Sequence, residues 1–231
     1  MTLELGTASV LRFRLARDEV RFPVKSLVIA AFTGRDREQV RRHIRELEEI
    51  GVRAPDRVPD FYLLPTTLLT TDQLIEVEGE QTSGEAEPVL FLGADRWYVG
   101  VGSDHTARDL ERESIPAAKR ACPKVVGREL LSYEDVAAGW DRLSLRSWVE
   151  VDGERIPYQE GSLAELLPVP KVLEELAEAV EVQREGMVVF LGTIPLLGGS
   201  FVPADTFTAE IASPDGEVRI ACSYRVRRTE R

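Results

Sequence analysis

Cysteine is scarce in this 231-residue sequence, and long apolar runs are absent. Two cysteines, Cys122 and Cys222, are too few for a disulfide framework, so we expect buried thiols in a reducing cytoplasm. Uninterrupted apolar stretches such as residues 27–32 are far shorter than the roughly 18 residues of a membrane span. Residues 1–10 lack a basic start followed by an apolar run, so we expect no secretory signal.

Basic residues are also in deficit. Lys and Arg number 29 against 40 Asp and Glu, which gives a formal net charge of −11. A surface of that sign disfavours nucleic acid as a partner. The arginines within residues 225–231 are typical of a solvated strand end. Acidic residues can also gather around a cation, and whether they do so in this chain depends on their positions. The length fits one large domain or two small ones, and we see no repeat and no linker.

Alternating apolar residues predict that strands dominate and that helices are few and scattered. This pattern favours an α+β fold with a mixed, curved sheet over a regular βαβ wrap. The predicted strands cover residues 10–15, 19–22, 26–32, 85–92, 97–101, 145–151 and 187–191, with a hairpin whose arms are 207–211 and 218–226. The predicted helices are one capped by Asp36 and ended by Gly51, one over 107–121 that Pro116 should break or restart, and two over 134–140 and 169–182.

Two glutamates lie two residues apart on a predicted strand. Because strand side chains alternate, Glu85 and Glu87 share one face with Val89 and Phe91. Two buried carboxylates on an apolar face are costly unless something pairs with them. A hard divalent cation such as Mg²⁺, Mn²⁺ or Ca²⁺ would compensate that cost. The alternative is a solvent-facing Glu-x-Glu on an edge strand.

A small, polar run follows the strand predicted over 97–101. It contains Gly100, Gly102 and Asp104, and such glycines allow close approach of a ligand or tight packing. Asp104 could therefore join a cation site. Taken by spacing alone, the same run is also compatible with a glycine-rich turn in which an Asp or Thr caps a helix.

Four motifs in the correct order resemble the fumarylacetoacetate hydrolase superfamily. Residues 103–111 (Ser-Asp-His-Thr-Ala-Arg-Asp-Leu-Glu) resemble the signature NDxSARDxQ, and Glu85-Ala86-Glu87 corresponds to its metal-binding Glu-x-Glu. Residues 151–170 are similar to VNGExxQxGxTxDM, and residues 192–194 (Gly-Thr-Ile) to a late GTP/GTI turn. The resemblance spans roughly residues 28–211 and is strongest to the DUF2848 branch of that superfamily.

The resemblance implies a fold, a cofactor and an assembly. The fold would be a mixed β-sheet or β-roll with few peripheral helices, in a single domain over 1–231 made of an N-terminal strand region (1–27) and a core (28–231). Glu85, Glu87 and Asp104 would bind the divalent cation, Mg²⁺ or Mn²⁺ and failing those Ca²⁺. The family is usually homodimeric. The segment between Glu87 and Asp104 is shorter than is usual in the family.

His43 and Glu46 resemble the histidine and glutamate of the family motif NYxxHxxE, in which such a pair activates water. A carboxylate that orients a histidine raises its basicity. The preceding Asn-Tyr is missing, and Glu38 and Gln39 stand nearby instead. From the residues alone, His43 is a histidine at the edge of the buried stripe of a surface helix.

Further residues correspond to catalytic or substrate-binding positions of the family. Lys124 lies at the matching distance for the family lysine, and Lys119 is the weaker candidate; either could also be a surface lysine. Leu64 replaces another family lysine, and Glu111 replaces the last glutamine of the signature. The residues expected to contact substrate are Arg108, Glu111 and Thr193.

Together these residues predict a metal-dependent hydrolase that cleaves a C–C bond of a 1,3-dicarbonyl or 2-oxo acid, such as an acylpyruvate, through an enolate. His43, oriented by Glu46, would activate water, and Lys124 would stabilise the departing enolate. The alternatives are a 2-oxo acid decarboxylase, isomerase or hydratase on the same metal site, or a degenerate, non-catalytic member that binds a small acid. The expected partner is a small oxo acid, with no nucleic acid and no membrane.

Overall fold

The computed structural model describes residues 9–49, 51–181 and 183–230, and most of its regular structure is β-strand. Ten strands form one mixed sheet, here called the large sheet, whose main path runs β2-β1-β12-β9-β8-β15-β3-β4, with β11 and β5 attached beside β9. Its strands are β1 (Ser9–Leu15), β2 (Asp18–Val24), β3 (Ser26–Ala31), β4 (Asp60–Leu64), β5 (Leu69–Thr70), β8 (Ala86–Leu92), β9 (Trp97–Asp104), β11 (Lys124–Val126), β12 (Glu129–Ser132) and β15 (Met187–Phe190).

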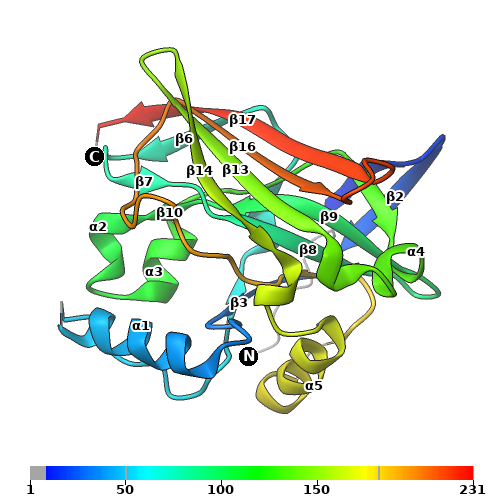
Figure 1. Cartoon of the computed structure of the whole chain (residues 1–231), viewed down its shortest axis with the longest axis horizontal. Helices are drawn as coiled ribbons and strands as arrows, with labels where there is room; N and C mark the ends of the chain where they lie inside the picture. The colour runs from blue at the N-terminus through cyan, green and yellow to red at the C-terminus, as the bar shows by residue number, and fades with distance from the viewer. Residues whose placement is uncertain (1–8, 50, 182, 231) are drawn as a thin grey trace.

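A second sheet of five strands, here called the small sheet, packs against the large one (Figure 1). Its order is β14-β13-β16-β17-β6, and β7 and β10 form a separate short pair. The bounds are β6 (Leu74–Glu78), β7 (Thr82–Ser83), β10 (Thr106–Ala107), β13 (Ser144–Val151), β14 (Glu154–Ser162), β16 (Thr206–Ala212) and β17 (Arg219–Thr229).

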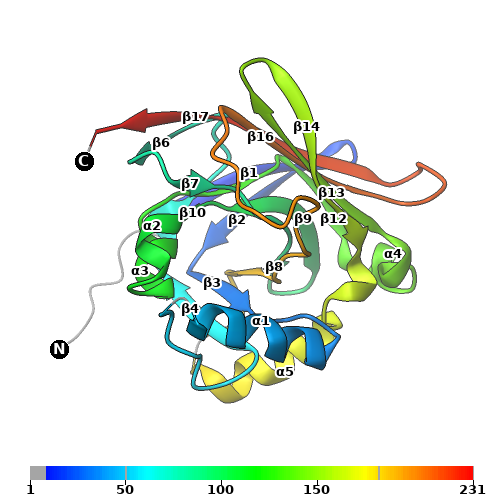
Figure 2. The same cartoon turned by 60° about the vertical axis from the view of Figure 1, so that its left-hand side comes forward.

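The large sheet is curled, as Figure 2 shows, and each of its faces carries a hydrophobic core. Inside the curl, the ring of Phe91 contacts the rings of Phe13 and Phe22 edge-on, with centroids 4.9 and 5.2 Å apart. The outer face packs against the small sheet through residues such as Leu90 and Phe207. The strand β8 is buried along its whole length because it lies between β9 and β15. The alternative of an exposed edge strand for the Glu-x-Glu motif is therefore wrong.

Five α-helices occur in the described residues, and all lie at the periphery. They are α1 (Arg37–Glu49), α2 (Arg108–Glu111), α3 (Ile115–Arg120), α4 (Tyr133–Ala137) and α5 (Val169–Ala179), with 3-10 turns η1 (Thr66–Leu68), η2 (Trp140–Arg142) and η3 (Leu163–Glu165). None of these helices combines the length and the apolarity that crossing a bilayer requires.

The predicted helix boundaries hold where a capping residue is present. Asp36 accepts hydrogen bonds from the next helical N–H groups and begins α1, as predicted. The helix predicted over 107–121 is divided into two short helices, as expected from Pro116, which lies in the first turn of α3 behind the N-cap Ser114. The helix predicted over 169–182 ends at Ala179, and residue 182 lies outside the described residues.

Two further features of the small sheet were not expected from the sequence. Residues 154–162 form the edge strand β14, although no strand is predicted there, and Pro157 is tolerated beside a bulge at Tyr158 of the same strand. The arginines at the end of β17 are partly paired, because Arg227 and Arg228 lie 3.2 and 3.1 Å from Glu76 and Asp205. Residues 1–8 of the N-terminal strand region and Arg231 lie outside the described residues.

The close approach of the two sheets at Gly127 generates a stability prediction. A Cβ at Gly127 would lie 2.3 Å from the carbonyl oxygen of Ala221 on β17, and neither backbone can yield without separating the sheets. We expect Gly127→Ala to lower the free energy of unfolding by about 2 kcal/mol or more, as measured by urea denaturation. Gly198→Ala is the matched control, because a Cβ there meets no atom within 4 Å. Equal midpoints for the two variants would contradict this account of the packing.

Candidate metal centre

The strand register gathers charged residues at one edge of the large sheet. The start of β8 lies opposite the end of β9, with Ala86 paired to Ser103, so the residues flanking these positions meet there. The start of β11 joins them, because Lys124 pairs with Asp104. The strand β15 ends at the same edge, where the backbone of Gly192 reaches β8. The β-ladder itself therefore positions the site.

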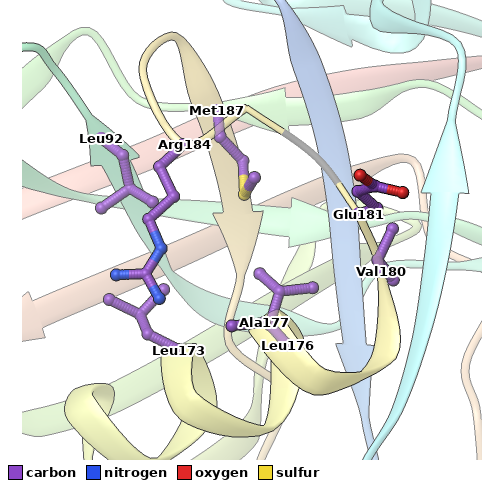
Figure 3. Close-up of a pocket in the computed structure, with 8 residues that line it drawn as sticks. All are labelled: Leu92, Leu173, Leu176, Ala177, Val180, Glu181, Arg184 and Met187. Atoms are coloured by element: carbon purple, nitrogen blue, oxygen red, sulfur yellow. The ribbon is translucent and has the colours of Figure 1, made fainter.

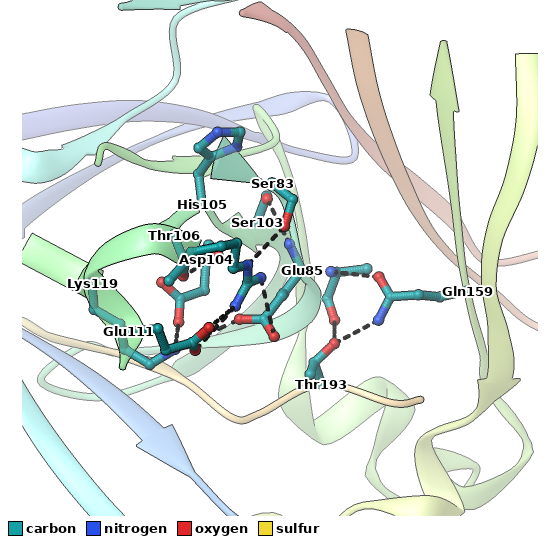
Figure 4. A network of polar contacts seen from close by, with 12 residues as sticks. Ser83, Glu85, Ser103, Asp104, His105, Thr106, Glu111, Lys119, Gln159 and Thr193 are labelled. Carbon is teal, nitrogen blue, oxygen red and sulfur yellow. Dashed lines mark hydrogen bonds and ion pairs between the residues drawn. The ribbon is translucent and has the colours of Figure 1, made fainter. Parts of the chain in front are cut away.

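The three predicted acids come together at this edge, and Figure 4 shows two of them, Glu85 and Asp104. Glu85, Glu87 and Asp104 each offer one carboxylate oxygen, and these oxygens lie within 4.8 Å of one another. Glu87 and Asp104 are buried, with exposed fractions of 2% and 0%. This cluster, here called the carboxylate cluster, is an all-oxygen donor set of the kind that hard divalent cations prefer.

Glu87 is held by the backbone of the turn that follows β15. The N–H of Gly192 donates to Oε2 of Glu87 over 2.8 Å. Gly192 has a φ of +98°, and a Cβ there would lie 1.9 Å from Oγ1 of Thr33. Only glycine can therefore aim its N–H group this way. Burial raises the pKa of Glu87 well above its usual range, and the neighbouring charge of Asp104 raises it further.

Two lysines pair with Asp104. The ammonium group of Lys119 donates to Oδ2, and Nζ of Lys124 lies 2.9 Å from Oδ1. Burial alone would raise the pKa of Asp104, but the two ammonium groups outweigh it and lower the pKa to about 2. Asp104 is therefore ionised at any physiological pH.

The two lysines occupy different places around the site. Lys124 is fully buried and donates to the carbonyl oxygen of His105 over 2.5 Å. Lys119 extends from α3 to the cluster, where its Nζ is also 3.6 Å from Oε2 of Glu85. Its local sequence, Ala-Ala-Lys-Arg-Ala, carries no signal that distinguishes this lysine from a surface residue.

Arg108 also contacts Glu85, and its guanidinium group already has several hydrogen-bond and ion-pair partners. It donates to both carboxylate oxygens of Glu111 over 3.1 Å and to Oγ of Ser83 over 2.8 Å. Its Nη2 is 3.4 Å from Oε1 of Glu85, and the ring of Phe201 stacks 3.5 Å from the guanidinium carbon. The predicted substrate contacts Arg108 and Glu111 thus form one ion pair next to the carboxylate cluster. Their contact with substrate stays a prediction.

Thr193 takes part in a network that fixes the start of β8. Its hydroxyl donates to the carbonyl oxygen of Ala86 over 2.9 Å and accepts from Nε2 of Gln159 over 2.7 Å. Oε1 of Gln159 in turn accepts from the N–H of Ala86 over 2.9 Å, as Figure 4 shows. A side chain of the small sheet therefore clamps the strand that carries Glu87. No role for Gln159 is predicted from the sequence.

His105 links the site to the small sheet. Its Nδ1 lies 2.8 Å from the hydroxyl of Tyr224, and its Nε2 lies 3.0 Å from Oγ1 of Thr82. Tyr224 also shares a hydrogen bond of 2.8 Å with Ser103, whose Oγ accepts from the N–H of Glu85. Burial, together with the nearby lysine and arginine charges, lowers the pKa of His105 to about 3. His105 is therefore a neutral structural link.

His43 and Glu46 lie apart from this cluster. Both side chains are exposed on α1, with Nδ1 of His43 3.7 Å from Oε2 of Glu46. The ring of His43 also lies 6.4 Å from that of Phe32, centroid to centroid. Within the described part of the chain, neither residue has a hydrogen bond or an ion pair to the carboxylate cluster. Their role as a water-activating pair stays a prediction.

The residues present fit a divalent cation. Oxygen ligands are the right type, and their mutual separations match coordination distances of roughly 2.0–2.6 Å. The cluster and its neighbours comprise four carboxylates (Glu85, Glu87, Asp104 and Glu111) and three cations (Arg108, Lys119 and Lys124), so one negative charge remains when all are ionised.

A separate cavity lies beside α5, away from the carboxylate cluster (Figure 3). Its volume is about 190 Å³. It is mainly apolar, with two charged side chains, and is lined by Leu92, Leu173, Leu176, Ala177, Val180, Glu181, Arg184 and Met187. None of the residues expected at the metal centre lines it.

Several solved structures share the fold of this chain. A candidate fumarylacetoacetate isomerase/hydrolase from Oleispira antarctica is 19% identical at a TM-score of 0.65, covering 94% of this chain and 100% of that one. The 5-carboxymethyl-2-hydroxymuconate delta-isomerase from Mycobacterium smegmatis is 19% identical at a TM-score of 0.64, covering 97% of this chain and 95% of that one. The fumarylpyruvate hydrolase from Pseudomonas aeruginosa, in complex with Mn²⁺ and pyruvate, is 19% identical at a TM-score of 0.63, covering 99% of this chain and 100% of that one. The chain thus has the fumarylacetoacetate hydrolase-type fold, as predicted.

Sequence comparison places the chain within a family. The family model described as "Protein of unknown function (DUF2848)" matches residues 30–224. The chain therefore belongs to the DUF2848 family, as its motifs indicated. Among curated proteins, no sequence matches it significantly.

The raised pKa of Glu87 predicts a pH-dependent effect in metal-free protein. A pKa that is higher in the folded than in the unfolded state means that folding binds protons, so this group's contribution to stability falls as pH rises above about 4.5. Glu87→Gln removes the buried charge and keeps an oxygen that can accept from Gly192. We expect the variant to gain stability over wild type, and the gain to be larger at pH 8 than at pH 5, in urea denaturation with a chelator present.

The matched control for this measurement is Glu154→Gln, which removes one exposed carboxylate on β14. If Glu87→Gln lost stability relative to wild type as the pH rose, the assigned direction of the pKa shift would be wrong.

Proposed function

We propose that this protein is a metal-dependent enzyme that hydrolyses a C–C bond of a 1,3-dicarbonyl or 2-oxo acid, of the acylpyruvate type, through an enolate. The observation that carries the proposal is the carboxylate cluster of Glu85, Glu87 and Asp104 with ammonium groups at its border. The fold supports it, because proteins with this fold include a fumarylpyruvate hydrolase in complex with Mn²⁺ and pyruvate. The resemblance also implies a homodimer, and the two cysteines favour a reducing cytoplasm; both are part of the proposal.

Glu85, Glu87 and Asp104 would hold the cation, either Mg²⁺ or Mn²⁺, with Ca²⁺ a third option. When bound, the cation would act as a Lewis acid toward a carbonyl oxygen. Lys124 would keep Asp104 ionised and correctly oriented, because it contacts both Oδ1 and the adjacent carbonyl oxygen of His105. It would also supply positive charge near a forming enolate.

The charge balance favours an anionic substrate. The residues around the cluster carry one net negative charge when all are ionised, so a divalent cation would leave one net positive charge. A monoanionic oxo acid would neutralise it. Arg108 and Thr193 would contact its oxygens, and Glu111 would position Arg108 through their ion pair.

Water activation is assigned to His43 and Glu46 on α1. The two side chains are already within 3.7 Å of each other, and their helix follows directly on β3, whose end contacts the Gly192 turn through Thr33. An exposed histidine that a carboxylate orients is suited to take a proton from water.

A second candidate function keeps the same centre but does not hydrolyse a C–C bond. An isomerase, decarboxylase or hydratase of 2-oxo acids would use the same cation and enolate chemistry. Among the described residues, His43 and Glu46 pair with each other and have no hydrogen bond or ion pair to the carboxylate cluster, which favours this option, as does the isomerase among proteins with this fold. The loss of a family lysine at Leu64 favours a third option, a non-catalytic protein that binds a small acid.

Metal removal tests the centre. We expect chelated protein to be inactive on an acylpyruvate, with Mn²⁺ or Mg²⁺ restoring turnover, and Glu87→Ala to lower kcat/KM by about 100-fold or more because one cation ligand is lost. The loss of enol absorbance measures turnover. Glu76→Ala, an exposed glutamate on β6, is the control and should keep wild-type rates. Turnover by the chelated protein at the rate of the metal-loaded protein would contradict the proposal.

Replacing His43 separates hydrolysis from the alternatives. If His43 activates water, His43→Ala should lower kcat for acylpyruvate hydrolysis by about 100-fold, and Glu46→Gln should have a smaller effect in the same direction. Arg42→Ala, next on the exposed helix surface, is the matched control. Unchanged hydrolysis in His43→Ala would remove this residue from the mechanism.

A further inference from the structure

Lys119 lies where a cation bound to the carboxylate cluster would lie. Its ammonium group hydrogen-bonds Oδ2 of Asp104 and is 3.6 Å from Oε2 of Glu85, so it contacts two of the three acids (Figure 4). The residue is buried, with 6% of its surface exposed, although it belongs to a peripheral helix. This position is unusual for lysine, whose long chain normally carries its charge into water.

The other cations around the cluster are committed elsewhere. Lys124 contacts Oδ1 of Asp104 and is fixed to the carbonyl oxygen of His105. Arg108 is bound to Glu111 and Ser83, with Glu85 as its third partner. Among the described residues, Lys119 is therefore the cation that contacts two members of the cluster, Asp104 and Glu85.

Space within the cluster allows one bridging cation. The three ligand oxygens lie within 4.8 Å of one another, which suits a single ion at coordination distance. An ammonium group that bonds Oδ2 of Asp104 occupies an oxygen that such an ion would use. Two cations cannot share these oxygens without strong repulsion at such short range.

We propose that Lys119 is a tethered counter-ion that competes with the divalent cation for Asp104 and Glu85, and that its displaced ammonium group then binds the anionic end of the organic ligand. This inference rests on the metal centre of the proposed function. Lys119 neutralises the acids when no cation is bound and becomes an anion-binding group when one is.

The displaced ammonium group needs a new partner because its surroundings are buried. An unpaired charge in such a place is costly. Glu111 is already paired with Arg108, so an anion brought by the ligand is the natural partner. The four-carbon stem of lysine allows this movement without a change in α3. Cation and organic anion therefore bind with positive coupling, and the coupling is reciprocal.

Calorimetric titration with Mn²⁺, with and without pyruvate, tests this inference on the full chain. In wild type, we expect pyruvate to strengthen Mn²⁺ binding. Lys119→Met removes the competing charge at similar length, so Mn²⁺ should bind the metal-free variant on the order of ten-fold more tightly than wild type. In this variant, pyruvate should strengthen Mn²⁺ binding only by the amount that direct chelation of Mn²⁺ by pyruvate provides. Lys171→Met, an exposed lysine on α5 paired with Glu174 and Glu175, is the matched control and should behave as wild type.

Each outcome decides between the two proposals. Equal or weaker Mn²⁺ binding by Lys119→Met, with wild type binding normally, would overturn the tethered counter-ion and leave the metal centre intact. Absence of Mn²⁺ binding in both proteins would overturn the metal centre together with this inference. If Lys119→Met fails to fold, as judged by circular dichroism, Lys119→Gln replaces it. The wild-type titration is also a test by itself. An affinity for Mn²⁺ that is the same with and without pyruvate would contradict the inference.

Discussion

Charge pairing around Asp104 is the interaction on which the described structure depends most. Several ionised groups lie at one buried edge of the large sheet, and each would be costly there without a partner. Two ammonium groups keep Asp104 ionised, while Glu87, which has only one backbone donor, resists ionisation. The negative charges of the site are thus compensated unevenly. Two ammonium groups neutralise Asp104, whereas burial destabilises the ionised form of Glu87. Such unevenness is common where proteins bind ions or do chemistry.

The small sheet supports this edge without supplying any of its charges. Gln159 clamps the start of β8, and Tyr224 reaches across to Ser103 and His105. Close contacts such as that of Gly127 with Ala221 hold the two sheets at a fixed distance. The carboxylates therefore sit on a backbone that is fixed from both sides, as a preorganised centre requires.

Sequence patterns predicted the central strands and the acids because both depend on short-range periodicity. The alternation that placed Glu85 and Glu87 on one face is a local property, and so are the cap at Asp36 and the break at Pro116. The strand β14 escaped prediction, since Pro157 and its polar neighbours carry no apolar alternation. Lys119 was only a weaker candidate, because the acids that pair with it lie on β9 and directly before β8 rather than on its own helix. Long-range packing of that kind leaves no local signature.

The hairpin that joins β8 to β9 has a consequence for how the protein could be redesigned. Only residues 93–96 connect the two strands, and the N–H of Gly93 bonds the carbonyl oxygen of Arg96 over 3.0 Å. Because the ladder between these strands carries the acids, the geometry of the centre cannot be altered in small steps without breaking the sheet. Variation costs least in the exposed parts of the segments that border it, residues 112–113 and 197–200. A library directed at those two segments would change which molecules the centre accepts while leaving its frame intact.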